Sequence, residues 1–188
     1  FVTLGADQQI DFGGIAKGYT GQKLAELFQE YGVSSALVSL GGNIQAIGTK
    51  PDGSSWEVGI RDPKGGQQDY IGVLSVESQA VVTSGGYERY FEEDGETYIH
   101  IINPRTGYPA DGDLLSVTIV SKDGTLADGM STALYIMGYE KACQFWRQHR
   151  EEFNVILVTD DGKIHISENL KGNFQTEWEL EMIESGSE

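Results

Sequence analysis

The sequence predicts an α+β domain whose helices pack on a mixed or antiparallel sheet. Short apolar runs of strand length are more numerous than helical segments, and the two kinds do not alternate strictly along the chain. The 25 glycines divide these runs into short elements, while prolines are scarce, with 4 in the chain. Because 39% of the 188 residues are hydrophobic and 10% are aromatic, a core can be buried, and we expect a single domain over residues 1–188.

Three segments have the apolar periodicity of helices: Ile15 to Tyr31, Leu126 to Met137 and Lys141 to Glu151. Gly32 is placed to end the first of them, since glycine commonly follows the last helical residue. The single cysteine, Cys143, falls in the third segment, where we expect a buried thiol and no disulfide. The apolar stripe of the first helix is predicted to consist of Ala16, Leu24, Leu27 and Phe28.

The predicted strands are short and are bounded by turn residues. In chain order they cover residues 35–39, 44–47, 56–60, 70–76, 80–83, 98–102, 115–120, 155–158 and 163–166. We expect the first strand to be buried and the last two to form a hairpin, because Asp160-Asp161-Gly162 is a favourable turn sequence. The acidic end of the chain, residues 177–188, is predicted to be a solvated tail.

The composition excludes several kinds of partner. With 13 Lys and Arg against 29 Asp and Glu, the formal net charge is −16, which opposes binding to nucleic acid or to an anionic membrane surface. A protein this acidic needs a metal ion or a local cationic site to hold an anionic substrate. The chain shows no apolar run of membrane-spanning length and no signal peptide. It opens on FVTLGADQQIDFGG, which resembles the middle of a domain, so we expect an upstream segment.

A glycine turn before the first helix is one candidate binding element. Gly13 and Gly14 precede the helix, and Lys17 lies in its first turn. Free N–H groups at a helix N-terminus suit phosphate, glycine lets a ligand approach the backbone, and lysine adds a positive charge. The alternative interpretation is a tight turn capped by Asp11 with a solvated lysine, and the motif alone favours it.

A second candidate element lies in the second predicted helix. Asp128 and Thr132 are four residues apart and therefore share one helix face. A carboxylate and a hydroxyl form a pair of oxygen ligands, which suits Mg²⁺ or Ca²⁺. Two protein ligands also leave room for water and a substrate phosphate. The alternative is an aspartate that is stabilised by the helix dipole.

Two further motifs lie at the ends of strands. His100 precedes a Pro/Gly turn, and histidine acts as a general base near neutral pH. It is equally compatible with a histidine held in a satisfied hydrogen bond. Residues 82–90 end a strand in hydroxyls and glycines, or form a turn with an aromatic anchor. His149 and His165 stand in polar sequence contexts and receive no role.

Taken together and in this order, the motifs resemble those of the FAD:protein FMN transferases, the ApbE-like family. The shared segments lie between Asp11 and Gly138 and read DFGGIAKGY, LGGN, WEVGIRDP, VVTSGGYER, YIHIINPRTG and ADGMSTAL. The resemblance implies an ApbE-like catalytic core related to the T-fold. It also implies a Mg²⁺-dependent enzyme that cuts FAD, transfers FMN to a Ser or Thr hydroxyl of an acceptor protein, and releases AMP.

The resemblance also implies a role for particular residues. Mg²⁺ would be held by Asp128, Thr132 and the backbone carbonyl of Gly14, with Ser131 beside the metal. The metal would then explain how so acidic a protein holds an anionic dinucleotide.

FAD is expected to contact a second set of residues. Asp11 and Lys17 match FAD-contacting positions, and the backbone near Ile102 is expected to pass the flavin nucleotide. His100 matches the histidine that acts in transfer. Asn103 stands where many relatives have Asp, so any role for a charge there is lost.

Three alternatives stay open at this point. The first is an FAD pyrophosphatase that gives FMN and AMP with water as the acceptor; the others are a non-enzymatic flavin-binding module and an acidic structural domain. Members of the family usually work outside the cytoplasmic membrane, often as lipoproteins. The resemblance therefore implies a location in the periplasm or at the outer face of the cell membrane, with any lipid anchor outside this chain.

Overall fold

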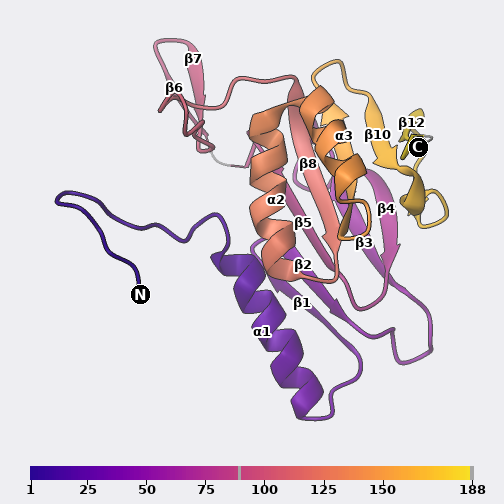
Figure 1. Cartoon of the computed structure of the whole chain (residues 1–188). Helices are drawn as coiled ribbons and strands as arrows, with labels where there is room; N and C mark the ends of the chain where they lie inside the picture. Colours follow the sequence, from indigo (N-terminus) through magenta and orange to yellow (C-terminus); the bar gives the residue numbers. More distant parts are fainter. Residues whose placement is uncertain (89, 187–188) are drawn as a thin grey trace.

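The computed structural model describes residues 1–88 and 90–186, which form three layers (Figure 1). The central layer is a sheet of seven strands. Neighbouring strands run antiparallel except for the last pair, which is parallel, so the sheet is mixed as predicted. In spatial order the strands are β1 (Ala36–Leu40), β2 (Asn43–Ile47), β5 (Ala80–Gly85), β8 (Leu114–Ser121), β9 (Phe153–Thr159), β10 (Ile164–Ser167) and β12 (Leu180–Ile183).

Helices cover one face of this sheet, and a smaller sheet covers the other. The helices are α1 (Ala16–Glu30), α2 (Gly124–Met137) and α3 (Tyr139–Gln148). The smaller sheet has the order β11-β4-β3, made of β11 (Phe174–Gln175), β4 (Tyr70–Val76) and β3 (Trp56–Arg61). A separate hairpin of β6 (Tyr90–Glu93) and β7 (Glu96–Ile99) projects from the body of the domain (Figure 1), and a short 3₁₀ turn spans Glu168–Leu170.

The central strands face both layers because successive side chains in a strand point to opposite sides. Val82 and Ile119 belong to the apolar cluster under the helices, whereas Val81 and Val120 belong to the cluster under the smaller sheet. Trp146 of α3 is fully buried in the first cluster, and its Nε1 donates to the carbonyl oxygen of Phe153 at 3.0 Å. The sequence prediction of an α+β domain is confirmed.

Many predicted elements are also confirmed. All three helices form within a few residues of their predicted bounds, and Gly32, with φ of 77°, follows the end of α1. β9 and β10 form the predicted hairpin, and Cys143 is a buried free thiol. Among the described residues, no helix combines the length and the apolarity that a membrane crossing requires.

Several predictions for strands are wrong. β1 is an edge strand whose residues are half-buried or exposed, not a buried one. The predicted strand at residues 98–102 ends at Ile99, after which Ile102 makes an isolated bridge to Pro109. The acidic end of the chain is not simply a solvated tail, because β12 pairs with β10 and buries Ile183. Parallel pairing of distant segments leaves no local signal in the sequence.

The predicted apolar stripe of α1 is wrong in part, because Ala16, Leu24 and Phe28 are half-buried but do not form the most buried face. Leu27 is 43% exposed, whereas the buried face of the helix consists of Gly18, Gly21 and Ala25. Small residues let the backbone of α1 approach its neighbours closely, and this close approach positions the candidate site described below.

The context of His165 differs from its prediction as well. This histidine of β10 is 5% exposed and lies against Tyr139, whose hydroxyl is 3.1 Å from Nδ1. Burial lowers the pKa of the imidazole below its ordinary value, and Lys163 acts in the same direction. The carboxylates of Glu181, 3.4 Å away, and Asp161 oppose this shift only in part.

This buried imidazole predicts a loss of stability in mild acid. A histidine whose folded pKa is lowered stabilises the fold fully above its unfolded pKa of about 6.5, and loses that contribution as the pH falls through the folded pKa. One proton changes the free energy of unfolding by at most about 1.4 kcal/mol per pH unit. Urea unfolding between pH 7.5 and 5 should show a steeper fall for the native chain than for His165→Phe. An unchanged slope in His165→Phe would contradict the assignment.

Candidate functional site

The candidate site is built where α1 crosses α2. A side chain at Gly18 would put its Cβ 2.1 Å from the carbonyl oxygen of Gly124 and 2.5 Å from Cβ of Asp128. Glycine at this position is therefore what lets the two helix backbones touch. The crossing brings the first turn of α1 against the carboxylate of Asp128 in α2.

Asp128 caps the N-terminus of α1 across this crossing. Ile15, which precedes the helix, provides no side-chain cap, so the first-turn amides need acceptors from elsewhere. The N–H of Gly18 donates to Oδ2 of Asp128 at 2.8 Å, and Asp128 is 5% exposed. Its other carboxylate oxygen makes no hydrogen bond within the described part of the chain.

The same contact frees the backbone carbonyl of Gly14. In a regular helix an N–H bonds the carbonyl four residues earlier, as the N–H of Tyr19 does with Ile15 at 3.0 Å. The N–H of Gly18, which would bond Gly14 in that pattern, turns to Asp128 instead. Gly14 is exposed, and a Cβ built on it would have open space around it. Its carbonyl oxygen is thus available to a ligand beside Asp128.

A chain of hydroxyl groups continues the site along α2. The hydroxyl of Ser131 donates to the backbone carbonyl of Asp128 at 2.8 Å. The hydroxyl of Ser84, at the end of β5, lies 2.8 Å from Oγ of Ser131 and 3.1 Å from Oγ1 of Thr132. Ser131 is fully buried, while Thr132 is half-buried. The sequence alone gives no role to Ser84, although Ser84 lies in the VVTSGG segment, which resembles the corresponding segment of the family.

The glycine turn and the LGGN segment also meet here. Nζ of Lys17 donates to the carbonyl of Gly41 at 3.3 Å, which joins two motifs that are 24 residues apart. Asp11 is exposed and accepts a hydrogen bond from the N–H of Gly13 at 2.6 Å, so it shapes the turn before the helix. Both residues therefore stand near the start of α1, as the sequence prediction requires.

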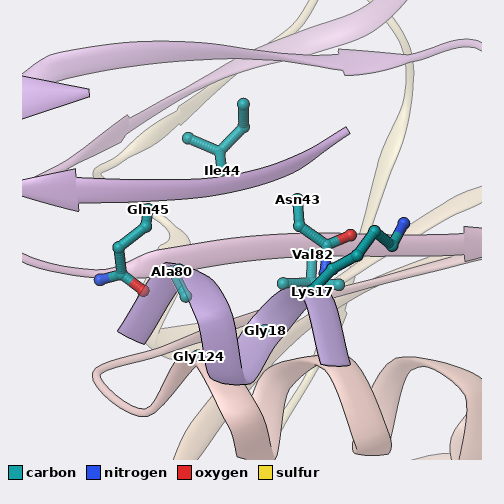
Figure 2. Close-up of a pocket in the computed structure, with 9 residues that line it drawn as sticks. Lys17, Gly18, Asn43, Ile44, Gln45, Ala80, Val82 and Gly124 are labelled. Carbon is teal, nitrogen blue, oxygen red and sulfur yellow. The ribbon is translucent and has the colours of Figure 1, made fainter. Parts of the chain in front are cut away.

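A small cavity lies between α1, α2 and the sheet (Figure 2). Its volume is about 10 Å³, and Lys17 and Gly124 line it together with residues of β2. Nδ2 of Asn43 and Oε1 of Gln45 are buried there without a hydrogen-bond partner in the described part of the chain. A space of this size fits about one water molecule, which can satisfy both groups. Sequence reasoning missed these two residues because buried amides have no periodic signal.

His100 and Ile102 lie on a different segment from the α1–α2 crossing. Both are exposed, and Ile102 forms the bridge to Pro109 that closes the following loop. The end of β5 lies between this segment and the α1–α2 crossing. A Cβ on Gly86, two residues after Ser84, would be 3.0 Å from Cγ2 of Ile99, the residue before His100. The end of β5 therefore touches the hydroxyl chain on one side and the His100 segment on the other.

A larger pocket of about 380 Å³ opens beside this segment. Tyr87 and Tyr135 contribute aromatic walls, and Ile99 places the pocket next to His100. Burial raises the pKa of Tyr87 to about 12, so its hydroxyl stays protonated at physiological pH. The guanidinium of Arg61 lies over the Tyr87 ring at 4.8 Å from the centroid. The aromatic anchor offered for residues 82–90 includes Tyr87, but the sequence does not predict a pocket there.

The residues at the crossing fit a hard divalent cation. They offer a carboxylate oxygen, a hydroxyl oxygen and a free carbonyl oxygen, a set that suits Mg²⁺ and is poor for Zn²⁺. The described residues contain no group of three or more His, Cys, Asp or Glu side chains that could hold a metal. A cation at this crossing would meet one carboxylate and neutral oxygens, which would leave coordination positions for phosphate.

Comparisons with known proteins identify the family of this chain. The model of the ApbE family matches residues 1–157. An "FAD:protein FMN transferase" of Klebsiella pneumoniae is 42% identical over 159 residues, covering 85% of this chain and 48% of that protein. One of Treponema pallidum is 46% identical over 151 residues, covering 76% of this chain and 42% of that protein. The chain thus spans about half the length of the curated relatives it matches.

Solved structures show the same fold. The ApbE protein of Thermotoga maritima superposes with a TM-score of 0.80 at 38% identity, covering 88% of this chain and 53% of that one. The flavin transferase ApbE of Vibrio cholerae superposes with a TM-score of 0.75 at 32% identity, covering 87% of this chain and 52% of that one. Because the family model matches residues 1–157 of the 188 and the fold is shared, the chain belongs to the ApbE family.

Proposed function

We propose that the protein to which this chain belongs is a Mg²⁺-dependent FAD:protein FMN transferase. The relatives that carry this name support the reaction class. The observation that carries the proposal furthest is the diversion of the Gly18 amide to Asp128, since it leaves the Gly14 carbonyl and one Asp128 oxygen free at the same helix crossing. An oxygen set of this kind is what a metal needs in order to neutralise a pyrophosphate.

The chain's own residues have distinct tasks in this proposal. Asp128, Thr132 and the Gly14 carbonyl hold Mg²⁺, which when bound neutralises charge on the pyrophosphate of FAD. Lys17, next to Gly18 at the start of α1, adds a positive charge for a phosphate oxygen. Asp11 holds the turn through the amide of Gly13, so that the backbone can approach the nucleotide.

His100 acts as the general base of the transfer step. It takes the proton from a Ser or Thr hydroxyl of the acceptor protein, and that oxygen attacks the phosphorus of the FMN half. A P–O bond forms to the acceptor, the P–O bond to AMP breaks, and AMP leaves with the electron pair. The exposure of His100 supports this role, because a base that serves another protein must be reachable from solvent. The flavin nucleotide passes the backbone near Ile102, which is exposed on the same segment.

An assay with two readouts tests this function. The chain and a longer parent protein are each incubated with FAD, Mg²⁺ and a candidate acceptor, and AMP and protein-bound flavin fluorescence are measured in parallel. We expect AMP and covalent flavin to appear in equal amounts and to vanish with EDTA. AMP without labelled protein, with several acceptors tried, would favour FAD hydrolysis, in which water is the acceptor. Stable FAD binding without AMP from the parent protein would favour a binding module.

The role of His100 has its own test. His100→Ala should lower the rate of transfer by about 100-fold while the dissociation constant of FAD changes less than threefold, because a general base contributes 10²–10⁴-fold and acts only in the transition state. His149→Ala, at a half-buried histidine whose Nδ1 lies 2.7 Å from Oε1 of Glu152, is the comparison variant and should keep the native rate. An equal loss of rate and FAD affinity would make His100 a binding residue instead.

We also propose an extracytoplasmic location, at the periplasmic or outer face of the cell membrane, with any lipid anchor outside residues 1–188. Members of the family usually work outside the cytoplasmic membrane, which supports this location. Fractionation of cells that express the whole protein checks it, and recovery of the protein with cytoplasmic markers would overturn it.

A further inference from the structure

The hydroxyl chain beside Asp128 has only one possible direction. It contains three hydrogen bonds, from Ser131 to the Asp128 carbonyl, between Ser84 and Ser131, and between Ser84 and Thr132. A carbonyl has no proton to give, so Ser131 must donate to it, and each hydroxyl has a single proton. Ser84 must then donate to Ser131, and Thr132 must donate to Ser84. All three protons are committed.

This direction determines what Thr132 can offer to a cation. A neutral hydroxyl binds a metal through an oxygen lone pair, so its proton has to be directed elsewhere. With the proton of Thr132 held by Ser84 at 3.1 Å, the lone pairs of Oγ1 face away from Ser84. Resting on the metal site proposed above, we propose that Ser84 is a positioning residue that orients the Thr132 hydroxyl for Mg²⁺.

Ser84 is rigid enough for this task. It lies in β5, where it is paired with Val117 of β8 in the middle of the seven-stranded sheet. Its own proton is fixed by Ser131, which is fully buried. The acceptor that Thr132 uses is therefore held by the sheet, not by the helix that carries Thr132.

Loss of the Ser84 hydroxyl would release the Thr132 proton. The acceptor that remains for a helical threonine is the carbonyl four residues earlier, that of Asp128, which the Thr132 proton would share with the Ser131 hydroxyl. Rotation toward it would turn the lone pairs away from their native direction. Ser84→Ala should thus weaken metal binding although Asp128, Thr132 and Gly14 are all still present.

Metal affinity, measured apart from turnover, tests this proposal. Mn²⁺ is titrated into the chain with FAD present, and free Mn²⁺ is followed by electron paramagnetic resonance against a blank of FAD alone. Ser84→Ala should raise the Mn²⁺ dissociation constant about tenfold, as loss of a ligand's hydrogen-bond partner typically does. Ser84→Thr, which keeps a hydroxyl, should restore native affinity. The matched control is Thr83→Val, because Thr83 is the preceding residue of β5 and bonds Thr118 at 2.8 Å on the opposite face of the sheet.

A double-mutant comparison separates positioning from general damage to the fold. If Ser84 acts through Thr132, Ser84→Ala should have no further effect on Mn²⁺ affinity in the Thr132→Val background. A full effect in that background, native affinity in Ser84→Ala, or an equal effect of Thr83→Val would each overturn the proposal. Failure of the metal site itself looks different: Asp128→Asn and Thr132→Val would then leave Mn²⁺ affinity unchanged, and the role of Ser84 would fall with the site.

Discussion

Gly18→Ala should destabilise the domain by about 3 kcal/mol and abolish the candidate site, because the new methyl group has no room. Its Cβ would overlap the Gly124 carbonyl at 2.1 Å and Asp128 Cβ at 2.5 Å, and the first of these atoms belongs to the backbone. Relief therefore requires α1 to move away from α2. That movement would separate the Gly18 amide from the Asp128 carboxylate, which are 2.8 Å apart.

Urea unfolding and Mg²⁺-dependent AMP release measure the two effects. Gly21→Ala is the matched control, since Gly21 lies one turn later on the same buried face and its Cβ would meet Gln45 Cβ at an ordinary 3.5 Å. Alanine favours a helix over glycine by about 1 kcal/mol, so this control should be neutral or slightly stabilising. Equal stability of the two variants would show that the close contact at Gly18 does not hold in solution.

Asp128→Asn should reduce Mg²⁺-dependent turnover at least about 100-fold while the fold keeps nearly its native stability. The amide oxygen of asparagine still accepts from the Gly18 amide, so the cap of α1 survives, but the anionic charge that attracts the cation is lost. Asp128→Ala is a poorer probe. It removes the cap as well, and should cost about 1–3 kcal/mol of stability.

The control for this variant lies at the start of the same helix. Asp123 caps α2 by accepting from the amides of Thr125 at 2.8 Å and Leu126 at 3.0 Å. Asp123→Asn keeps a good capping residue and should retain native turnover. Turnover and thermal melting are measured on both variants. Native turnover in Asp128→Asn would remove this carboxylate from the metal site, whereas unfolding of the variant would show that asparagine fails as a cap.

The sequence predicts well those elements whose evidence lies in residues that are close together in the chain. α2 could be placed from its apolar periodicity, and its i, i+4 spacing put Asp128 and Thr132 on one face. The β9–β10 hairpin was predicted because its turn residues are adjacent in the chain. Recognition of the family supplied roles for these residues, which periodicity alone leaves open.

The elements that sequence missed depend on distant partners. The sequence misplaces the stripe of α1 because a glycine face has no hydrophobic signal. Packing against α2 buries Gly18, and packing against Gln45 of β2 buries Gly21. β12 was missed because its partner β10 lies in a separate segment, and the burial of His165 follows from the strands around it. Ser84 gained its importance only when the sheet brought it against α2.

In the proposed site, the double use of Asp128 would make docking of α1 and binding of a cation one equilibrium. Each local opening of the α1–α2 contact removes the amide partner of Asp128 and also displaces the Gly14 carbonyl from it. A ligand that needs both groups therefore makes such openings rarer by a factor of 1 + [L]/Kd. In a chain whose α1 has not yet docked, the proposed cation site is incomplete, so a bound cation would stabilise only molecules that have finished folding.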